Sequence, residues 1–152
     1  MGRVLGIDYG ERRIGVAVSD PTALLAQPLP TLARRRGKRP PFSTLEALLR
    51  EYDIEHIVIG LPLLPSGEES DWTREVRTFG ENLARRSDTP VSYIDERFTS
   101  QAAERAVRAL GLPRHERERK ERVDAAAAVL ILQAFLDARR RVDAARIVEE
   151  EE

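Results

Sequence analysis

The spacing of apolar residues along the chain predicts alternating strands and helices. Short apolar runs bounded by polar turns predict strands over 4–8, 13–19, 23–32, 56–60 and 91–95. The first two runs flank a tight polar turn, so we expect them to form an antiparallel hairpin. Pro28 and Pro30 interrupt the third run, which favours an edge strand or a loop because proline has no N–H to donate to a sheet.

Apolar residues spaced three and four apart predict helices over 43–52, 72–86, 100–110 and 123–141. Ser43 and Glu46 have the spacing of a capping box, which predicts the start of the first helix. An initial hairpin followed by alternating helices and strands predicts an α/β fold with a mixed five-stranded central sheet and helices on both faces. We expect a single domain over 1–142 and a charged, disordered acidic tail over 143–152.

The composition excludes several classes of protein. The 152 residues include no cysteine, which rules out disulfides, zinc ribbons, iron–sulfur clusters and thiol nucleophiles. No apolar run approaches about 18 residues, the length that a transmembrane helix needs. The first residues form an expected strand and lack the layout of a signal peptide. We therefore expect a soluble, cytoplasmic protein that does not bind membranes.

Charge is distributed unevenly along the chain. The 25 basic and 26 acidic residues nearly cancel, but four of the acids are the last four residues. Almost all of the basic residues are arginine, whose planar fork suits phosphate groups. They dominate the segment 34–39, whereas 114–122 mixes cations with glutamates. Such runs indicate either a nucleic-acid contact or a solvated surface, and GC-rich codon usage would also raise the arginine content.

Carboxylates stand at the ends of apolar elements, where burial makes them costly. Asp8 ends the first strand, Asp95 and Glu96 end a later strand, and Asp124 begins the last helix on its apolar face. A buried carboxylate is strongly destabilising unless it is paired or binds a cation. Oxygen ligands without cysteine indicate Mg²⁺ or Mn²⁺. The local alternatives are a favourable helix N-terminus for Asp124, turn chemistry for Asp8 and an ion pair with Arg97.

Four blocks along the chain combine glycines, acids and hydroxyl groups: GIDYGERRIGVAVSD at 6–20, IVIGLPL at 57–63, DERFTS at 95–100 and VDAAAAVLILQ at 123–133. Together they resemble the YqgF/RuvX family of RNase H-like proteins, described as pre-16S rRNA nucleases or Holliday junction resolvase-like proteins. The resemblance covers about 4–140. The chain departs from the family pattern at Ser100, where a second threonine is usual, and in the stretch before Gly67.

The resemblance implies an RNase H-like fold and a hydrolase with a two-metal mechanism. The family carries acids at the positions of Asp8, Glu96 and Asp124, which are therefore the expected catalytic residues and ligands of Mg²⁺ or Mn²⁺. Candidate nucleic-acid contacts lie beside these acids: Arg12, Arg13, Arg97, Thr99 and Arg122. Two of them have structural alternatives, since Arg97 could pair with Asp95 and Thr99 could be the N-cap of the next helix.

The expected function is metal-dependent endo- or exonuclease cleavage of structured RNA, with 5′-end maturation of pre-16S rRNA as its task. Holliday junction (four-way DNA) resolution is the alternative activity. The alternative class is a non-catalytic nucleic-acid-binding factor linked to transcription. The expected partners are pre-rRNA or branched DNA and a ribosomal precursor particle, with the chain a monomer or weak homodimer. His56, Trp72 and Phe79 are expected to be structural, because they occupy apolar runs or helical positions.

Overall fold

The structure is a computed structural model that describes residues 2–34, 39–98 and 116–151. Its elements, in chain order, are β1 (Arg3–Tyr9), β2 (Arg13–Ser19), β3 (Ala26–Ala33), α1 (Phe42–Glu51), β4 (Ile54–Leu61), α2 (Asp71–Ser87), β5 (Val91–Asp95), the 3₁₀ turn η1 (Glu96–Phe98) and α4 (Glu116–Glu151). The helix expected over 100–110 lies outside the described residues, as do Thr99 and the middle of the basic segment, 35–38.

The strands form one mixed sheet in the order β3-β2-β1-β4-β5. β1 and β2 pair in antiparallel fashion, so the predicted hairpin is confirmed. β4 runs parallel to β1, and β5 runs parallel to β4, so the carboxyl ends of these three strands meet at one edge of the sheet. β3 lies at the edge of the sheet and contains Pro28 and Pro30, as the proline pattern predicts.

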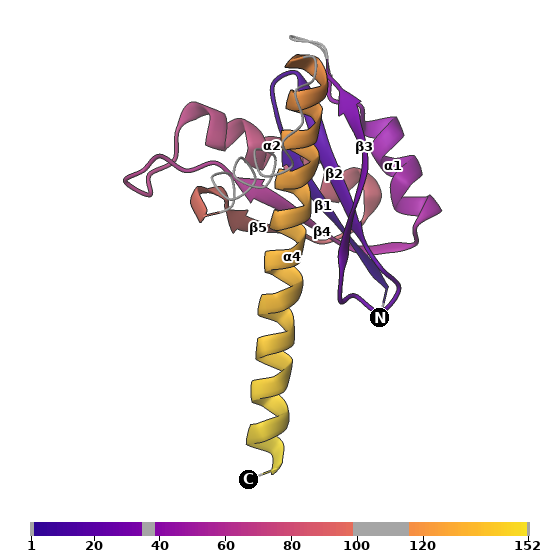
Figure 1. The fold of residues 1–152 in the computed structure, drawn as a ribbon, viewed down its shortest axis with the longest axis vertical. Coiled ribbons are helices and arrows are strands. Elements are labelled where there is room, and N and C mark those ends of the chain that lie inside the picture. Colours follow the sequence, from indigo (N-terminus) through magenta and orange to yellow (C-terminus); the bar gives the residue numbers. More distant parts are fainter. Residues whose placement is uncertain (1, 35–38, 99–115, 152) are drawn as a thin grey trace.

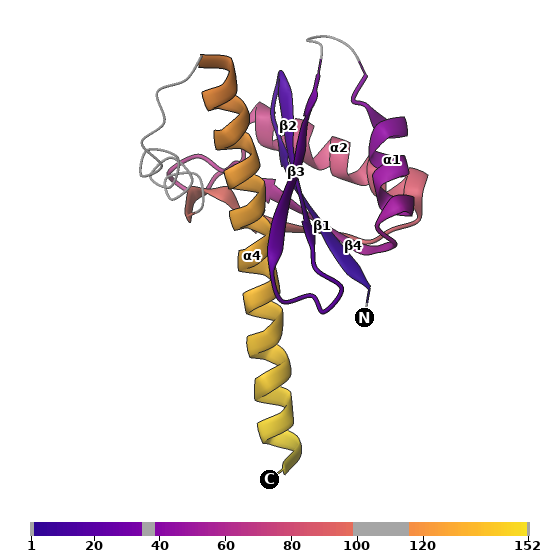
Figure 2. The same cartoon turned by 45° about the vertical axis from the view of Figure 1, so that its right-hand side comes forward.

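Successive residues of each strand face opposite sides of the sheet. Leu5, Ile7 and Tyr9 of β1 belong to a core that includes α1 and α2, whereas Val4 belongs to a second core that includes α4. Figures 1 and 2 show α4 on one side of the sheet and α1 and α2 on the other. The predicted mixed sheet with helices on both faces is therefore confirmed.

The start of α1 differs from the prediction. The helix begins at Phe42, its N-cap is Pro41, and no side chain caps it, so the capping box predicted at Ser43 and Glu46 is wrong. Phe42 is only 7% exposed and packs in the core. Burial of this ring favours a helix that begins one residue earlier, and tertiary packing thus outweighs the local capping pattern.

The last helix is longer than its apolar pattern predicts. We expected 123–141, but α4 spans 36 residues and continues to Glu151. Its C-terminal part extends away from the sheet (Figure 1). The helix includes 143–151, and both the domain boundary at 142 and the disordered tail expected after it stay predictions. None of the helices in the described part of the chain combines the length and the apolar character needed to cross a membrane.

Candidate active site

Two of the predicted catalytic acids follow or end strands that β4 separates, and both lie at the edge where the carboxyl ends of these strands meet. Asp8 lies near the end of β1, on the same side as Val4, and therefore faces α4. Glu96 begins η1 directly after β5. Because β1, β4 and β5 are parallel, both acids lie at the carboxyl ends of parallel strands, where ligands of open α/β sheets commonly bind.

The side chains of Asp8 and Glu96 are hydrogen-bonded to each other. Burial of Asp8, followed by the hydrogen bond to Glu96 and its negative charge, raises the pKa of Asp8 to about 9. Two carboxyl groups in contact cannot both ionise easily, so Asp8 keeps its proton at neutral pH in the absence of a cation. The pKa of Asp8 is raised further from its ordinary value than any other resolved pKa is shifted among the described residues.

The third predicted acid, Asp124, is brought to the same side of the sheet by α4. It lies inside this helix, which begins at Glu116, so the prediction that Asp124 stands at the helix N-terminus is wrong. Its backbone lies against Gly15 of β2, where a Cβ atom would stand 2.2 Å from the carbonyl oxygen of Asp124. Gly15 is also the residue opposite Asp8 in the β1–β2 pairing. The absence of a side chain at Gly15 therefore lets α4 approach the strand that neighbours Asp8.

Arg13 contacts the Asp124 carboxylate directly. Its Nε donates to Oδ2 of Asp124 at 2.9 Å, and each side chain is about a quarter exposed, at 27% and 25%. We predicted Arg13 as a contact to nucleic acid, and the pattern gave no sign of this pairing across 111 positions. In the structure, an arginine thus offsets the charge of the third acid.

The structure places the three predicted acids in two groups. Across 2–34, 39–98 and 116–151, no group of three or more His, Asp or Glu side chains is arranged to hold a metal ion. The structure brings Asp8 and Glu96 into contact and places Asp124 with Arg13 on the same side of the sheet. The three-acid site predicted from the sequence stays a prediction.

A further glycine, missed by the sequence analysis, makes room for this site. Gly60 lies in β4, between β1 and β5, and a Cβ atom there would stand 3.3 Å from Cδ of Glu96 and 2.5 Å from Cδ1 of Ile131. A side chain at this position would thus compete for space with both Glu96 and α4. The sequence feature that could have identified Gly60 is its place at the end of the apolar run 56–60.

Asp95 and Arg97 form a local ion pair. The Arg97 guanidinium donates to both carboxylate oxygens of Asp95, with the shortest contact at 2.6 Å, and also to the Pro65 carbonyl at 3.2 Å. Arg97 holds the pKa of the Asp95 carboxyl below its usual value. The structural alternative for Arg97 is therefore confirmed, and the residue connects the end of β5 to the loop that follows β4.

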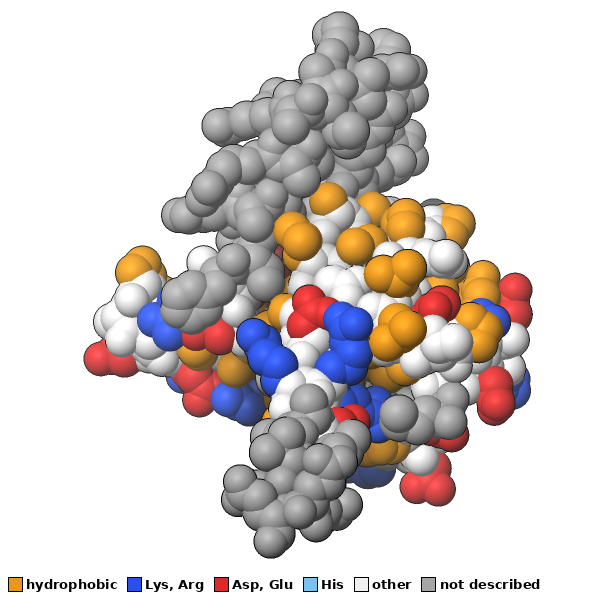
Figure 3. Space-filling model, turned by 60° about the horizontal axis from the view of Figure 1, so that its bottom comes forward, with side chains coloured by type: hydrophobic (Ala, Val, Ile, Leu, Met, Phe, Trp, Pro, Cys, Tyr) orange, Lys and Arg blue, Asp and Glu red, His pale blue; other side chains and the backbone are white. Residues whose placement is uncertain are grey.

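The structure describes one of the other predicted nucleic-acid contacts, Arg12, and leaves the side chains of two others outside its described part. Arg12 is exposed in the turn between β1 and β2, close in sequence to Arg13. Arg122 lies within α4, but its side chain is outside the described part of the structure, as is the whole of Thr99. Figure 3 shows one face of the molecule on which basic, acidic and apolar side chains are interspersed. Contacts of these residues with nucleic acid stay predictions.

The three residues expected to be structural, His56, Trp72 and Phe79, all pack against other side chains. The Nε2 atom of His56 lies 2.8 Å from the Ser92 hydroxyl, and its ring stacks on Phe135 with a centroid distance of 5.2 Å. Burial, with a smaller contribution from the charge of Arg139, lowers the pKa of His56. Phe79 lies in the core and Trp72 packs against it. Packing thus accounts for the place of all three residues.

Residues 2–138 match the family described as RuvX, Holliday junction resolvase, and this match decides the family of the chain. The chain belongs to the RuvX family. A RuvX relative from Koribacter versatilis is 45% identical over 142 residues, which cover 93% of this chain and 90% of the relative. Another, from Roseiflexus sp., is 41% identical over 139 residues, covering 91% and 96%. Both carry the name "Putative pre-16S rRNA nuclease".

Solved structures confirm the fold of this RuvX chain. The complex of T. thermophilus RuvC with a Holliday junction substrate aligns with a TM-score of 0.56 at 20% identity, over 91% of this chain and 96% of that one. The yeast mitochondrial Holliday junction resolvase aligns with a TM-score of 0.57 at 12% identity, over 99% and 84%. The predicted family and the RNase H-like fold are thus confirmed, and the chain is a hydrolase of a nuclease family.

The ion pair between Arg13 and Asp124 yields a prediction on stability. We expect Arg13→Gln and Asp124→Asn each to destabilise the metal-free protein, and the double variant to lose less than the sum. The expected coupling is about 1 kcal/mol, because the pair is only partly exposed. Urea unfolding of the four proteins in EDTA measures it. Strictly additive losses would mean that the pair does not fasten α4 to β2 in solution.

Proposed function

We propose that the chain is a metal-dependent nuclease that hydrolyses phosphodiester bonds of structured RNA, with 5′-end maturation of pre-16S rRNA as its task. The observation that carries the proposal is the hydrogen-bonded pair of Asp8 and Glu96, both partly buried, at the carboxyl ends of β1 and β5. The RNA substrate is supported by the name of the relatives, which are 40–45% identical over most of the chain.

The residues present fit a divalent cation. Asp8 and Glu96 offer only oxygen donors, and the burial of Asp8 beside Glu96 disfavours a negative charge on Asp8 unless a cation offsets it. These two side chains would hold Mg²⁺ or Mn²⁺, and Asp124 is the proposed third ligand. A cation bound there supplies Lewis-acid stabilisation of the charge that develops on the phosphate oxygens during hydrolysis.

The chain's own cations would position the substrate. Arg13 uses Nε to contact Asp124, and the terminal nitrogens of its guanidinium are the donors suited to a phosphate beside the acids. Arg12 is exposed in the same turn and would contact a neighbouring phosphate. Arg97, Thr99 and Arg122 complete the proposed set of nucleic-acid contacts. Each of these contacts would fix the position of the nucleic-acid strand in the site rather than read its base sequence.

A four-way DNA junction is the second candidate substrate. Holliday junctions are named in the family description and form the substrate in the aligned T. thermophilus complex. Paired cuts on a junction require two symmetric active sites and therefore a dimer. We favour RNA because the relatives with the higher identity carry the rRNA nuclease name, and we propose a cytoplasmic monomer or weak homodimer that acts on a ribosomal precursor particle.

One set of assays tests the proposal. The purified protein is incubated with a labelled RNA that contains the 5′ precursor region of 16S rRNA, and with a labelled four-way DNA junction, each in Mg²⁺, Mn²⁺ or EDTA. We expect RNA cleavage that requires the metal and leaves the junction intact. Cleavage of the junction alone would support the second candidate. Binding of both substrates without cleavage in either metal would contradict a nuclease.

A further inference from the structure

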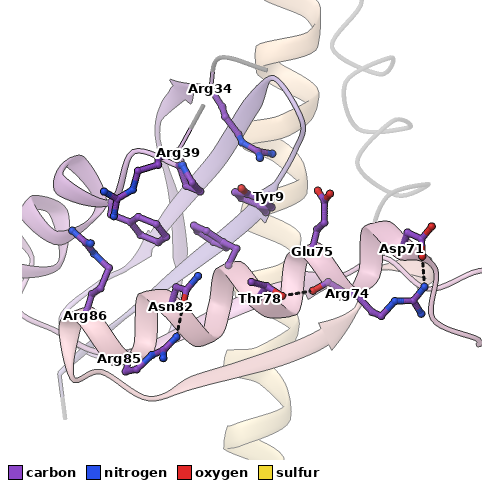
Figure 4. A pocket seen from close by; sticks show the side chains of 13 residues that line it. Tyr9, Arg34, Arg39, Asp71, Arg74, Glu75, Thr78, Asn82, Arg85 and Arg86 are labelled. Atoms are coloured by element: carbon purple, nitrogen blue, oxygen red, sulfur yellow. Dashed lines mark hydrogen bonds and ion pairs between the residues drawn. The ribbon is translucent and has the colours of Figure 1, made fainter. Parts of the chain in front are cut away.

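A groove lined by arginines lies on the face of the sheet opposite the acids. It has a volume of about 720 Å³ and is bounded by α2, the start of α1 and the segment that follows β3 (Figure 4). Tyr9 forms part of its floor, and this residue packs in the core with α1 and α2. Five arginines line the groove: Arg34, Arg39, Arg74, Arg85 and Arg86.

The guanidinium of Arg34 lies over an aromatic ring at one end of the groove. Its guanidinium carbon stands 4.6 Å from the centroid of the Tyr9 ring, and Nη1 donates to the Gly10 carbonyl at 3.3 Å. Its Nε is buried and has no hydrogen-bond partner among the described residues. Stacking fixes the plane of a guanidinium while its edge stays available to an anion, so Arg34 is pre-organised for one.

A second stacked guanidinium lies across the groove. Arg86 of α2 stands 4.8 Å from the centroid of the Phe42 ring and donates through Nε to Glu46 at 2.7 Å. Arg39 is exposed and extends along the same wall, as Figure 4 shows. Arg85 contacts the side-chain oxygen of Asn82, a neutral group, and keeps its full charge. Cations thus stand on both sides of the groove.

The acids of the groove do not cancel this charge. Asp71 and Glu75 are the two acids that line it, and Asp71 is ion-paired with Arg74 along α2. Arg86 is paired with Glu46 in the same way, which leaves Glu75 against three arginines, Arg34, Arg39 and Arg85. A concave surface with an excess of one charge concentrates ions of the opposite sign. The groove therefore suits an anion with several charged groups along its length.

The groove and the acids are linked by the tip of the β1–β2 hairpin. Asp8 and Tyr9 are consecutive residues of β1 that face opposite sides of the sheet. The backbone N–H of Arg34 donates to the Arg12 carbonyl at 2.7 Å, so the groove begins beside the turn that carries Arg12 and Arg13. A chain of phosphates that leaves the acids can thus pass over this turn and reach the groove.

We propose that this arginine groove binds the phosphodiester backbone of the nucleic acid at a distance from the scissile bond, as a second anchoring surface on the far face of the sheet. The inference rests on the proposed function only in taking nucleic acid as the polyanion. Each arginine that contacts a phosphate releases counterions, so the surface would raise affinity and its dependence on salt without reading sequence.

The test measures binding in EDTA, where cleavage is absent. The groove variant is Arg39→Gln/Arg85→Gln, because both side chains are exposed and neither pairs with an acid in the described residues. The control variant is Arg50→Gln/Arg141→Gln, which removes two exposed arginines outside the groove. Fluorescence anisotropy with a labelled precursor RNA gives Kd between 50 and 200 mM salt, in steps of about 50 mM.

We expect the groove variant to lose about tenfold in affinity at the lowest salt and about 1–2 units of salt slope, whereas the control changes little. Equal losses in the two variants would reduce the effect to net charge and overturn the proposal. RNA affinity that stays at the level of the unmodified protein would also overturn it, and would point to an acidic protein as the ligand. Cleavage by the unmodified protein is scored separately, so failure of the nuclease proposal is distinguishable.

Discussion

Asp8→Asn is expected to reduce cleavage by about 10³-fold or more while leaving nucleic-acid binding equal or tighter. Asparagine keeps the size of the side chain but removes the negative charge that would hold the metal ion. A loss of about 4 kcal/mol of transition-state stabilisation corresponds to that factor. Binding does not fall, because the substitution removes an anionic group from a surface that faces phosphates.

The same substitution is expected to stabilise the metal-free protein at neutral and alkaline pH. Burial and Glu96 raise the pKa of Asp8 from an ordinary 3.8 to about 9, so the folded state holds a proton that the unfolded state releases. The stability linked to that proton is complete below the unfolded pKa and is lost as pH rises through the folded one. The substituted amide cannot ionise, so the advantage of the variant should grow from about pH 4 to about pH 9.

Thermal and urea unfolding in EDTA measure this second effect, and we expect the variant to gain about 1–2 kcal/mol at about pH 8. Asp53→Asn is the matched control, because Asp53 is exposed and outside both the acidic pair and the groove. Its left-handed backbone, with φ of 51°, also accepts asparagine. Cleavage by Asp8→Asn at the unmodified rate would contradict the catalytic role, and a loss of stability that grows with pH would contradict the buried pair.

Among the described glycines, Gly15 is the one at which we expect an added methyl group, as in Gly15→Ala, to be most damaging. The new Cβ would stand 2.2 Å from the carbonyl oxygen of Asp124 and 3.3 Å from its Cβ, so either β2 or α4 has to move. The neighbour is backbone and cannot rotate away, as a side chain could. Overpacking of this kind costs about 2–3 kcal/mol, and it displaces Asp124 from Arg13 and from the strand beside Asp8.

Urea unfolding and the RNA cleavage assay together test this prediction. Gly2→Ala is the control, because its Cβ would meet the side chain of Glu55, which is exposed and able to move. We expect the control to retain stability and cleavage, and Gly15→Ala to lose both. Full cleavage by Gly15→Ala would show that the position of Asp124 is unimportant and would count against its proposed role as third ligand.

Much of the fold follows from the periodicity of the chain. All five apolar runs that predicted strands correspond to strands in the structure. This prediction succeeds because the pattern of apolar residues within a short segment is enough to indicate a strand. The prolines of β3 placed it at the edge for an equally local reason, since a proline nitrogen cannot donate to a neighbouring strand. The capping box at Ser43 failed because burial of Phe42, a long-range effect, determined where α1 begins.

The candidate acids could also be identified from the sequence. A carboxylate at the end of an apolar run is unusual, because charged side chains are rarely buried unless they are paired. The family motifs added the assignment of Glu96 rather than Asp95, which stays a prediction, and in the structure Asp95 pairs with Arg97. The sequence thus determined the fold class, the family and the identity of the candidate ligands.

Only the tertiary structure decided how these residues are partnered. Arg13 and Asp124 lie 111 positions apart, and no periodic pattern predicts a contact across that distance. The groove likewise brings Arg34 and Arg39, which stand between β3 and α1 in the chain, together with Arg86 of α2 on the face opposite Asp8. Periodicity assigns a residue to a face of its own element, but the packing of elements sets which faces meet, and that packing depends on the whole chain at once.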